Sequence, residues 1–145
     1  MQSISEYSDA KFRDQVIRLW VTVFRYKTPH NTPGLAIDKK LAVHDGLFFV
    51  ALADESVVGT VLAGYDGHRG WLYSVAVDPL HRKRGIGVAL VRHAELALTE
   101  RGCVKINLQI AGGNESVVSF YESLGYVIEP RVSMGKVVSH NITGA

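Results

Sequence analysis

Residues 78–88 read Asp-Pro-Leu-His-Arg-Lys-Arg-Gly-Ile-Gly-Val and lie between two segments of different character. The apolar run 71–77 comes before them, and Pro79 ends that run because proline cannot continue a β-ladder. A segment with helical spacing follows over 87–101. A strand, a basic glycine turn and a helix start point several backbone N–H groups and the positive end of a helix dipole at one place. Together with the cations of 82–84, this order predicts an anion site suited to a pyrophosphate.

The residues before the turn predict helices first and strands afterwards. Apolar side chains recur at helical spacing in the first forty residues, and the pattern then changes to strand-like runs bounded by turn residues. Gly59 and Gly64 interrupt one of these runs and indicate bulges or a close backbone approach. We expect an edge strand over 2–7 and two helices over 9–24 and 35–44. A meander of three strands should follow over 47–53, 57–65 and 71–77.

The residues after the turn predict a β-α-β unit and a short tail. A helix over 87–101, stopped by Gly102, leads to an alternating strand over 104–110. Asn114 is placed to cap a short helix over 115–124. We expect a last pair of strands over 126–128 and 132–138, around Pro130, and a polar tail that frays over 139–145. The fold class is therefore α/β: one mixed, mostly antiparallel domain over 1–145.

Composition limits the classes of function. The chain has 145 residues, 47% of them hydrophobic and 21% charged, which suits one globular domain. Its net charge of +2 is too small for bulk binding to nucleic acid. Cys103 is the only cysteine, so an internal disulfide is excluded, and its place in an apolar strand favours a core role over a nucleophilic one. With neither a signal-like start nor an apolar run of membrane-spanning length, we expect a cytoplasmic protein that binds no membrane.

Two known phosphate-binding patterns fail on the basic turn. A nucleoside-triphosphate P-loop requires Lys followed by Ser or Thr after its last glycine, and neither follows Gly87. A dinucleotide-binding turn requires a third glycine at position 90, which here is Leu90. An ordinary strand–helix turn with solvated charges stays open on the local sequence alone.

Two separate signatures resemble those of the GNAT family of N-acetyltransferases. The first is Val75-Ala76-Val77-Asp78-Pro79 followed by Arg82-x-x-Gly85-x-Gly87, which is similar to the family's acetyl-CoA signature. The second is Asn114 followed by Phe120-Tyr121-Glu122-Ser123-Leu124-Gly125-Tyr126. Their separation leaves room for one helix and one strand, as in the family. The resemblance covers the meander through Tyr126 closely and the helical N-terminal part in outline.

The resemblance implies acetyl-CoA as the acyl donor, with coenzyme A as the product and no metal. The backbone N–H groups of Arg84, Gly85, Ile86, Gly87 and Val88 would hold the pyrophosphate, beside Arg82 and Lys83. The backbone of Val75, Ala76 and Val77 would bind the pantetheine arm, and one N–H of Val75 or Val77 would polarise the thioester carbonyl. Asn114 would lie near the cofactor arm, although a role as a helix cap is a close rival.

The resemblance also implies direct attack by a primary amine, with Tyr121 as the general acid that protonates the departing thiolate. Core packing is the rival interpretation of Tyr121, and it is the one we prefer for Phe120. The general base is open. Some relatives carry a glutamate where this chain has Gln109, which cannot accept a proton at neutral pH. The candidates are Asp66, His68 and Tyr73, or a water molecule; His81 fits better as part of the phosphate turn.

The sequence does not identify the amine that accepts the acetyl group. In the family, the loop between the first two helices helps to shape the acceptor slot. Here that loop, 26–32, holds no acidic residue for a polycation. A small molecule, a peptide N-terminus and a protein lysine all stay open, and the pattern is also compatible with a homodimer. Because Gln109 replaces a glutamate, a non-catalytic module that binds acyl-CoA or a protein partner is the alternative function, and a nucleotide-binding regulator is a more remote one.

Overall fold

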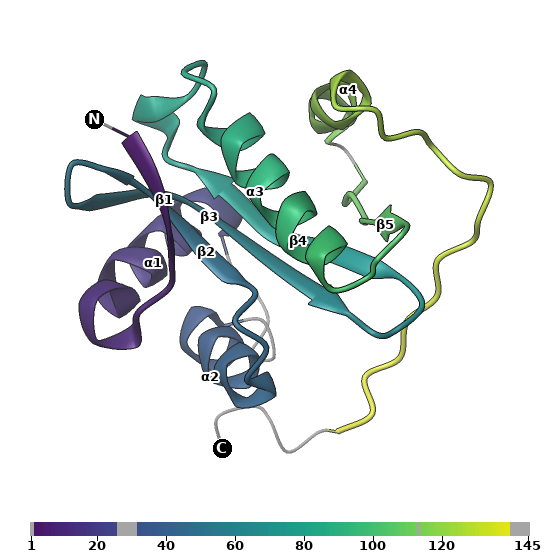
Figure 1. The fold of residues 1–145 in the computed structure, drawn as a ribbon, viewed down its shortest axis with the longest axis horizontal. Coiled ribbons are helices and arrows are strands. Elements are labelled where there is room, and N and C mark those ends of the chain that lie inside the picture. The colour runs from purple at the N-terminus through teal and green to yellow at the C-terminus, as the bar shows by residue number, and fades with distance from the viewer. Residues whose placement is uncertain (1, 26–31, 113, 140–145) are drawn as a thin grey trace. The chain divides into compact units, whose positions relative to one another are not determined.

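The computed structural model describes residues 2–25, 32–112 and 114–139 (Figure 1). Its elements follow in the order β1 (Gln2–Glu6), α1 (Asp9–Phe24), α2 (Pro33–Val43), β2 (Phe48–Ala53), β3 (Ser56–Tyr65), β4 (Gly70–Val77), a 3-10 turn (Pro79–His81), α3 (Ile86–Glu100), β5 (Ile106–Asn107) and α4 (Glu115–Ser123). The chain divides into two compact units, Met1–Leu108 and Gln109–Ala145. The expected single domain over 1–145 stays a prediction.

The first unit is built on one sheet with the order β1-β2-β3-β4-β5. The first three pairings are antiparallel, and β4 and β5 pair in parallel. A parallel pair needs a crossover connection, which α3 supplies. The α/β class and the mostly antiparallel sheet with its β-α-β unit are therefore confirmed. No helix in the described residues is long and apolar enough to cross a membrane.

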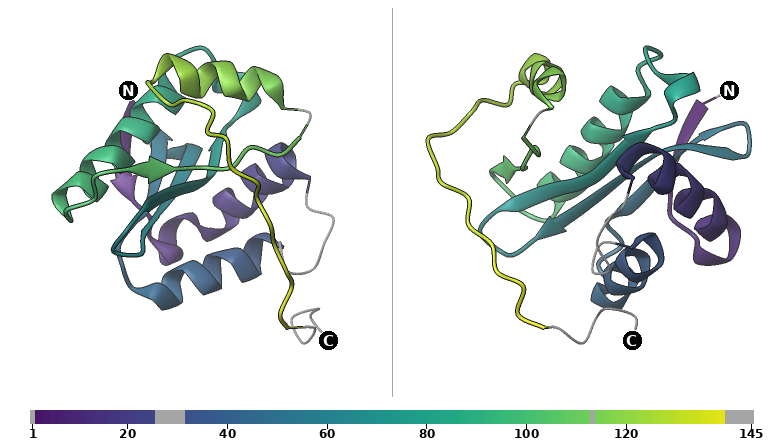
Figure 2. Two further views of the ribbon diagram at one scale, coloured as in Figure 1. Left: turned by 90° about the vertical axis from the view of Figure 1, so that its right-hand side faces the viewer. Right: turned by 180° about the vertical axis from the view of Figure 1, so that it is seen from behind.

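Helices cover both faces of this sheet. In Figure 1 α3 lies in front of the strands, and Figure 2 shows α1 and α2 on the opposite face. Each helix turns an apolar stripe toward the strands at the spacing of a helical face. The buried stripe residues are Phe12, Val16, Leu19 and Trp20 on α1, and Ile86, Leu90, Val91, Ala94 and Leu98 on α3.

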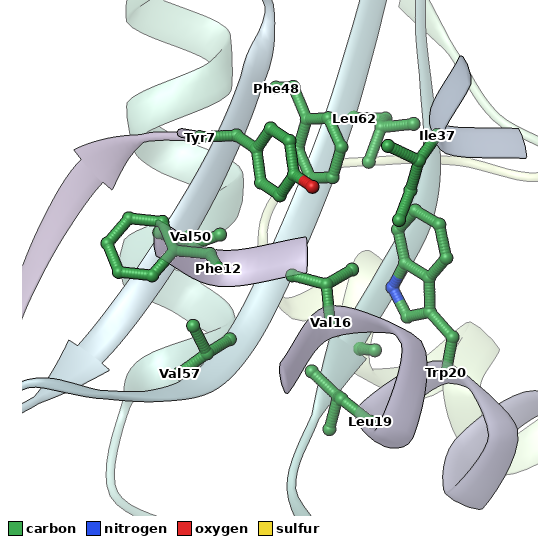
Figure 3. Close-up of a cluster of buried hydrophobic side chains, with 11 residues drawn as sticks. Tyr7, Phe12, Val16, Leu19, Trp20, Ile37, Phe48, Val50, Val57 and Leu62 are labelled. Atoms are coloured by element: carbon green, nitrogen blue, oxygen red, sulfur yellow. The ribbon is translucent and has the colours of Figure 1, made fainter. Parts of the chain in front are cut away.

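An aromatic stack organises the core beneath α1 (Figure 3). The ring of Phe48 stacks on Tyr7 at 4.1 Å between centroids and on Trp20 at 5.8 Å. Trp20 is fully buried, and its indole Nε1 donates a hydrogen bond to Thr60 on β3. Because a buried indole N–H needs an acceptor, Thr60 satisfies the one polar atom that Trp20 brings into the core.

Gly59 marks a close backbone approach, as the sequence predicted. A Cβ at this position would lie 2.8 Å from Leu90 Cδ1 on α3 and 3.0 Å from the Ala76 carbonyl on β4. A bulge also adjoins it, since Ala51 pairs with Gly59 while Leu52 pairs with Val57. At Gly64 the prediction is wrong: the register is regular there, and a Cβ would find its nearest neighbours at 3.8 Å.

Four expected elements differ from the structure by two residues or more. The second helix begins at Pro33, two residues early, because proline is favourable at a first helical position, where no N–H partner is needed. The predicted strand 104–110 is reduced to Ile106–Asn107, paired with Gly70 and Trp71 at the start of β4. Residues 126–139, all described, form no strand, because alternation without a partner edge does not make one and Pro130 cannot donate to a ladder.

Candidate active site

The turn after β4 is anchored at its first residue. The backbone N–H of Asp78 donates to the Val58 carbonyl at 2.8 Å, which ties the end of β4 to β3. The carboxylate of Asp78 accepts from the Leu80 N–H at 3.0 Å and caps the short 3-10 turn. His81 Nδ1 lies 3.3 Å from the other carboxylate oxygen. The chain therefore enters the basic run from a fixed point, and His81 belongs to this anchor.

Two residues in the left-handed region reverse the chain into α3. Lys83 has φ of 64° and Gly85 has φ of 79°. A side chain is strained in this region, so glycine is favoured at 85, where a Cβ would meet nothing within 4 Å. Gly85 is thus required for its conformation, and the space beside it is open.

The N-terminus of α3 has the properties of an anion site. The first intrahelical bond at this end runs from the Ala89 N–H to the Gly85 carbonyl. Consequently, the N–H groups of Ile86, Gly87 and Val88 have no acceptor within the helix. The first turn holds no acidic residue that would occupy them. Three exposed cations, Arg82, Lys83 and Arg84, precede it, and the 15-residue helix adds its dipole.

A bulge interrupts β4 shortly before the basic turn. Leu62 pairs with Tyr73 and Thr60 pairs with Ala76, so Val61 stands opposite two residues, Ser74 and Val75. Ser74 adopts φ of 49°, which is unusual for a residue other than glycine. A bulge takes backbone groups out of the regular ladder. The strand that leads into the anion site therefore has irregular, half-buried backbone at 74–75.

The candidate bases do not converge on this bulge. Asp66 is held by the turn at the tip of the β3–β4 hairpin, where the backbone N–H groups of Arg69 and His68 lower the pKa of its carboxyl. The exposed His68 sits at the same tip. β4 begins at Gly70, four residues before Ser74, so the hairpin tip before Gly70 lies at least roughly 13 Å from the bulge at 3.3 Å per strand residue. Only Tyr73, which is 42% exposed, adjoins the bulge directly.

The second unit carries the other predicted residues. Tyr121 is buried on α4, between the ring of Phe120 at 5.0 Å and the ring of Tyr126 at 5.7 Å. Burial raises the pKa of its phenol to about 12. Asn114 stands at the N-cap position of α4, as expected, but its side chain makes no capping hydrogen bond. Gln109 donates its amide to Ser133 Oγ at 2.7 Å.

Two predicted segments lie outside the described residues. They are 26–31 of the expected acceptor loop and 140–145 of the expected tail. Among the residues that are described, no group of three or more His, Cys, Asp or Glu side chains is arranged to hold a metal ion.

Sequence reasoning missed one buried cation, Lys40 on α2. Its ammonium pairs with Asp45 at 2.8 Å, donates to the Ala63 carbonyl and lies 5.5 Å from the centre of the Tyr73 ring. Lys40 also lines a cavity of about 480 Å³ between β1, the end of α2 and the start of β2, which none of the predicted site residues lines. The only sequence signal was its position three residues after the buried Ile37, which places it on the inner side of the helix.

Comparison with known proteins gives a consistent result. The chain matches one protein family, described as the acetyltransferase (GNAT) family, over residues 13–126. A curated relative from Sodalis glossinidius (strain morsitans), acetyltransferase SG1711, is 43% identical over 119 residues, which are 82% of this chain and 83% of that protein.

Solved structures of similar fold agree. Ard1 from Thermoplasma volcanium superposes with a TM-score of 0.77 at 25% identity, covering 88% of this chain and 84% of that one. The PaiA N-acetyltransferase from Thermoplasma acidophilum, solved in complex with coenzyme A, gives a TM-score of 0.78 at 17% identity, covering 91% of this chain and 93% of that one. The second likeness shows the fold alone.

Proposed function

Because the chain belongs to the GNAT family and is an acetyl-CoA-dependent N-acetyltransferase, we propose that it transfers the acetyl group directly to a primary amine, using the turn after β4, the β4 bulge and Tyr121. The observation that carries this proposal is the start of α3. There, N–H groups without an acceptor in the helix, three cations and an open space at Gly85 meet directly after an irregular strand.

The residues of this turn fit the pyrophosphate of acetyl-CoA. The N–H groups of Arg84, Gly85, Ile86, Gly87 and Val88 would donate to its oxygens, and Arg82 and Lys83 would balance its charge. A carboxylate in the first turn would repel this anion, and none is present there. The anchoring of Asp78 to Val58 keeps the turn in place before the ligand binds, which lowers the cost of ordering it.

The strand before the turn fits the rest of the cofactor. Backbone groups of Val75, Ala76 and Val77 would pair with the pantetheine arm as an added strand does. Ala76 is buried, so its side chain faces the core, and the half-buried Val75 and Val77 lie one residue to either side of it. The Val75 N–H would donate to the thioester carbonyl as negative charge develops on its oxygen.

Bound acetyl-CoA supplies an acyl group activated as a thioester, and the protein's own residues manage the protons. The attacking amine must first lose its proton. Asp66 and His68 lie at the tip of the β3–β4 hairpin, away from the β4 bulge. We therefore expect a water molecule near Tyr73, which adjoins the bulge, to accept this proton. With its pKa near 12, Tyr121 keeps its proton at neutral pH and is available to donate it as the C–S bond breaks.

The test of this role is the substitution Tyr121→Phe, with release of free thiol followed for a panel of small amines, peptide N-termini and lysine peptides. We expect kcat to fall by about 100-fold or more, as for loss of a general acid, with the Kd for acetyl-CoA retained. The matched control is Tyr65→Phe, which removes a phenol bound to the Gly67 carbonyl at the far end of β3. Wild-type turnover in Tyr121→Phe would show that Tyr121 is a packing residue.

A further inference from the structure

A chain of hydrogen bonds joins α1 to the β4 bulge through the core. Trp20 Nε1 donates to Thr60 Oγ1 at 2.8 Å, and Thr60 Oγ1 donates to the Ser74 carbonyl at 2.9 Å. Trp20 and Thr60 are both 0% exposed. The direction of the chain is fixed by chemistry, because an indole N–H only donates and a carbonyl only accepts. The single hydroxyl proton of Thr60 must therefore point at Ser74.

The acceptor of this chain is the residue that forms the bulge. Ser74 has φ of 49°, a backbone conformation that residues other than glycine rarely adopt. Ser74 and Val75 together stand opposite the single residue Val61. A strained conformation persists only where its surroundings hold it. Thr60 lies on β3 directly before Val61 and binds the Ser74 carbonyl, so it holds the bulge from the neighbouring strand.

The peptide bond transmits this restraint to the next N–H group. The Ser74 carbonyl and the Val75 N–H belong to one planar trans peptide unit, so they point in opposite directions. A carbonyl fixed toward the buried Thr60 thus turns the Val75 N–H away from that hydroxyl. Hydrogen bonds in series also polarise one another, so a bound Ser74 carbonyl makes the Val75 N–H a stronger donor.

We propose that Thr60, supported by Trp20, is a positioning residue that aims the Val75 N–H at the thioester carbonyl. This inference rests on the proposed function, because it requires that the β4 bulge face the acyl group of acetyl-CoA. It adds a defined role for two residues that lie in the core and touch no substrate. Thr60 acts through Ser74 and Val75. A loss of its hydroxyl should therefore lower kcat and leave the Kd for coenzyme A unchanged.

The experiment compares Thr60→Val, which keeps the shape and removes the hydroxyl, with Thr60→Ser, which restores it. We expect kcat to fall by about 10- to 100-fold in Thr60→Val, as for a weakened oxyanion donor, and to recover to within about 3-fold in Thr60→Ser. The Kd for coenzyme A should stay within about 2-fold of wild type in both. Val50→Ala, in the same core on β2, controls for loss of stability without touching the chain of bonds.

A second readout is independent of turnover. The amide signal of Val75 in a nitrogen–proton NMR spectrum should shift more with acetyl-CoA than with coenzyme A in the wild type. In Thr60→Val that difference should disappear. Should Thr60→Val not fold, Trp20→Phe keeps a six-membered aromatic ring in the core and removes the indole N–H that donates to Thr60, together with the rest of the pyrrole ring. A smaller loss of both kcat and the Val75 shift is then expected, and Val50→Ala controls for the loss of packing.

Different results would contradict the positioning role of Thr60 and the proposed use of the β4 bulge. Equal Val75 shifts in Thr60→Val and wild type, or a kcat no lower than that of Val50→Ala, would overturn the positioning role and leave the acetyltransferase site standing. A wild-type Val75 signal that does not distinguish acetyl-CoA from coenzyme A would instead overturn the use of the bulge, and the positioning role with it.

Discussion

Gly85 shows how one residue combines a folding requirement with a binding one. Its φ of 79° is available to glycine without strain, and it stands directly before the N–H groups at the start of α3. A side chain here would project into the open space beside that helix start. The same position therefore fixes the turn and keeps the approach to the helix clear.

We expect Gly85→Ala to lower the free energy of unfolding by about 1–2 kcal/mol, the cost of a left-handed alanine, and to raise the KM for acetyl-CoA about 10-fold. Gly67→Ala is the matched control, since Gly67 has φ of 92° in the β3–β4 turn and equally open surroundings. It should lose similar stability with KM unchanged. Urea unfolding and steady-state kinetics measure both quantities, and equal KM values for the two variants would contradict the phosphate site.

The buried phenol of Tyr121 predicts a loss of stability in alkaline solution. Burial raises the pKa of Tyr121 from 10.0 to about 12, so the unfolded chain releases this proton more readily than the folded one. Its contribution to stability is full below pH 10 and is lost as the pH rises toward 12. Wild type and Tyr65→Phe should lose more stability over this range than Tyr121→Phe in urea unfolding. Parallel curves for all three proteins would show that Tyr121 is not desolvated.

At the scale of elements, β3 holds the sheet close to the helix that carries the anion site. Gly59 faces Leu90 and Ile86 of α3 at distances that leave no room for a methyl group. This close contact fixes the first turn of α3, where the phosphate-binding N–H groups lie, against the centre of the sheet. A substitution here therefore tests the packing beneath the site.

We expect Gly59→Ala to lower the free energy of unfolding by about 1–3 kcal/mol, because an added Cβ would overlap Leu90 and the Ala76 carbonyl. Gly64→Ala on the same strand should change it by less than about 1 kcal/mol, since its nearest neighbours lie at 3.8 Å. Thermal and urea unfolding of the two variants give the comparison. An equal loss in both would mean that strand propensity, rather than contact with α3, sets the effect.

Local patterns predicted the elements that bury a regular face. The helix α1 begins and ends at the expected residues, because its apolar spacing is strict. The predicted length of the strand 104–110 was too great. Alternation of apolar and polar residues shows which face each side chain occupies, but it does not show how far the partner strand extends. The strands expected over 126–138 depended on a partner in the same way, and Val127, Ile128 and Val132 are exposed there.

At the scale of the whole molecule, the sequence predicted the donor half of the reaction more fully than the acceptor half. Signatures at 75–87 and 114–126 are local in the chain, so they are visible without coordinates. The Trp20–Thr60–Ser74 chain joins residues 40 and 14 positions apart, and Lys40 acquires its partners only when α2 packs on the sheet. Such contacts leave no pattern in the sequence.

The most direct test of the proposed transfer to a primary amine is the stoichiometry of acetyl transfer by the purified wild-type protein. Incubation with acetyl-CoA and the amine panel should release one free thiol for each N-acetylated amine formed, and thiol release should require both substrates. A folded protein that released no thiol above background with any class of amine would contradict the proposed transfer. Thiol release without an acetylated amine would contradict it equally, because it would indicate hydrolysis of the thioester instead of transfer.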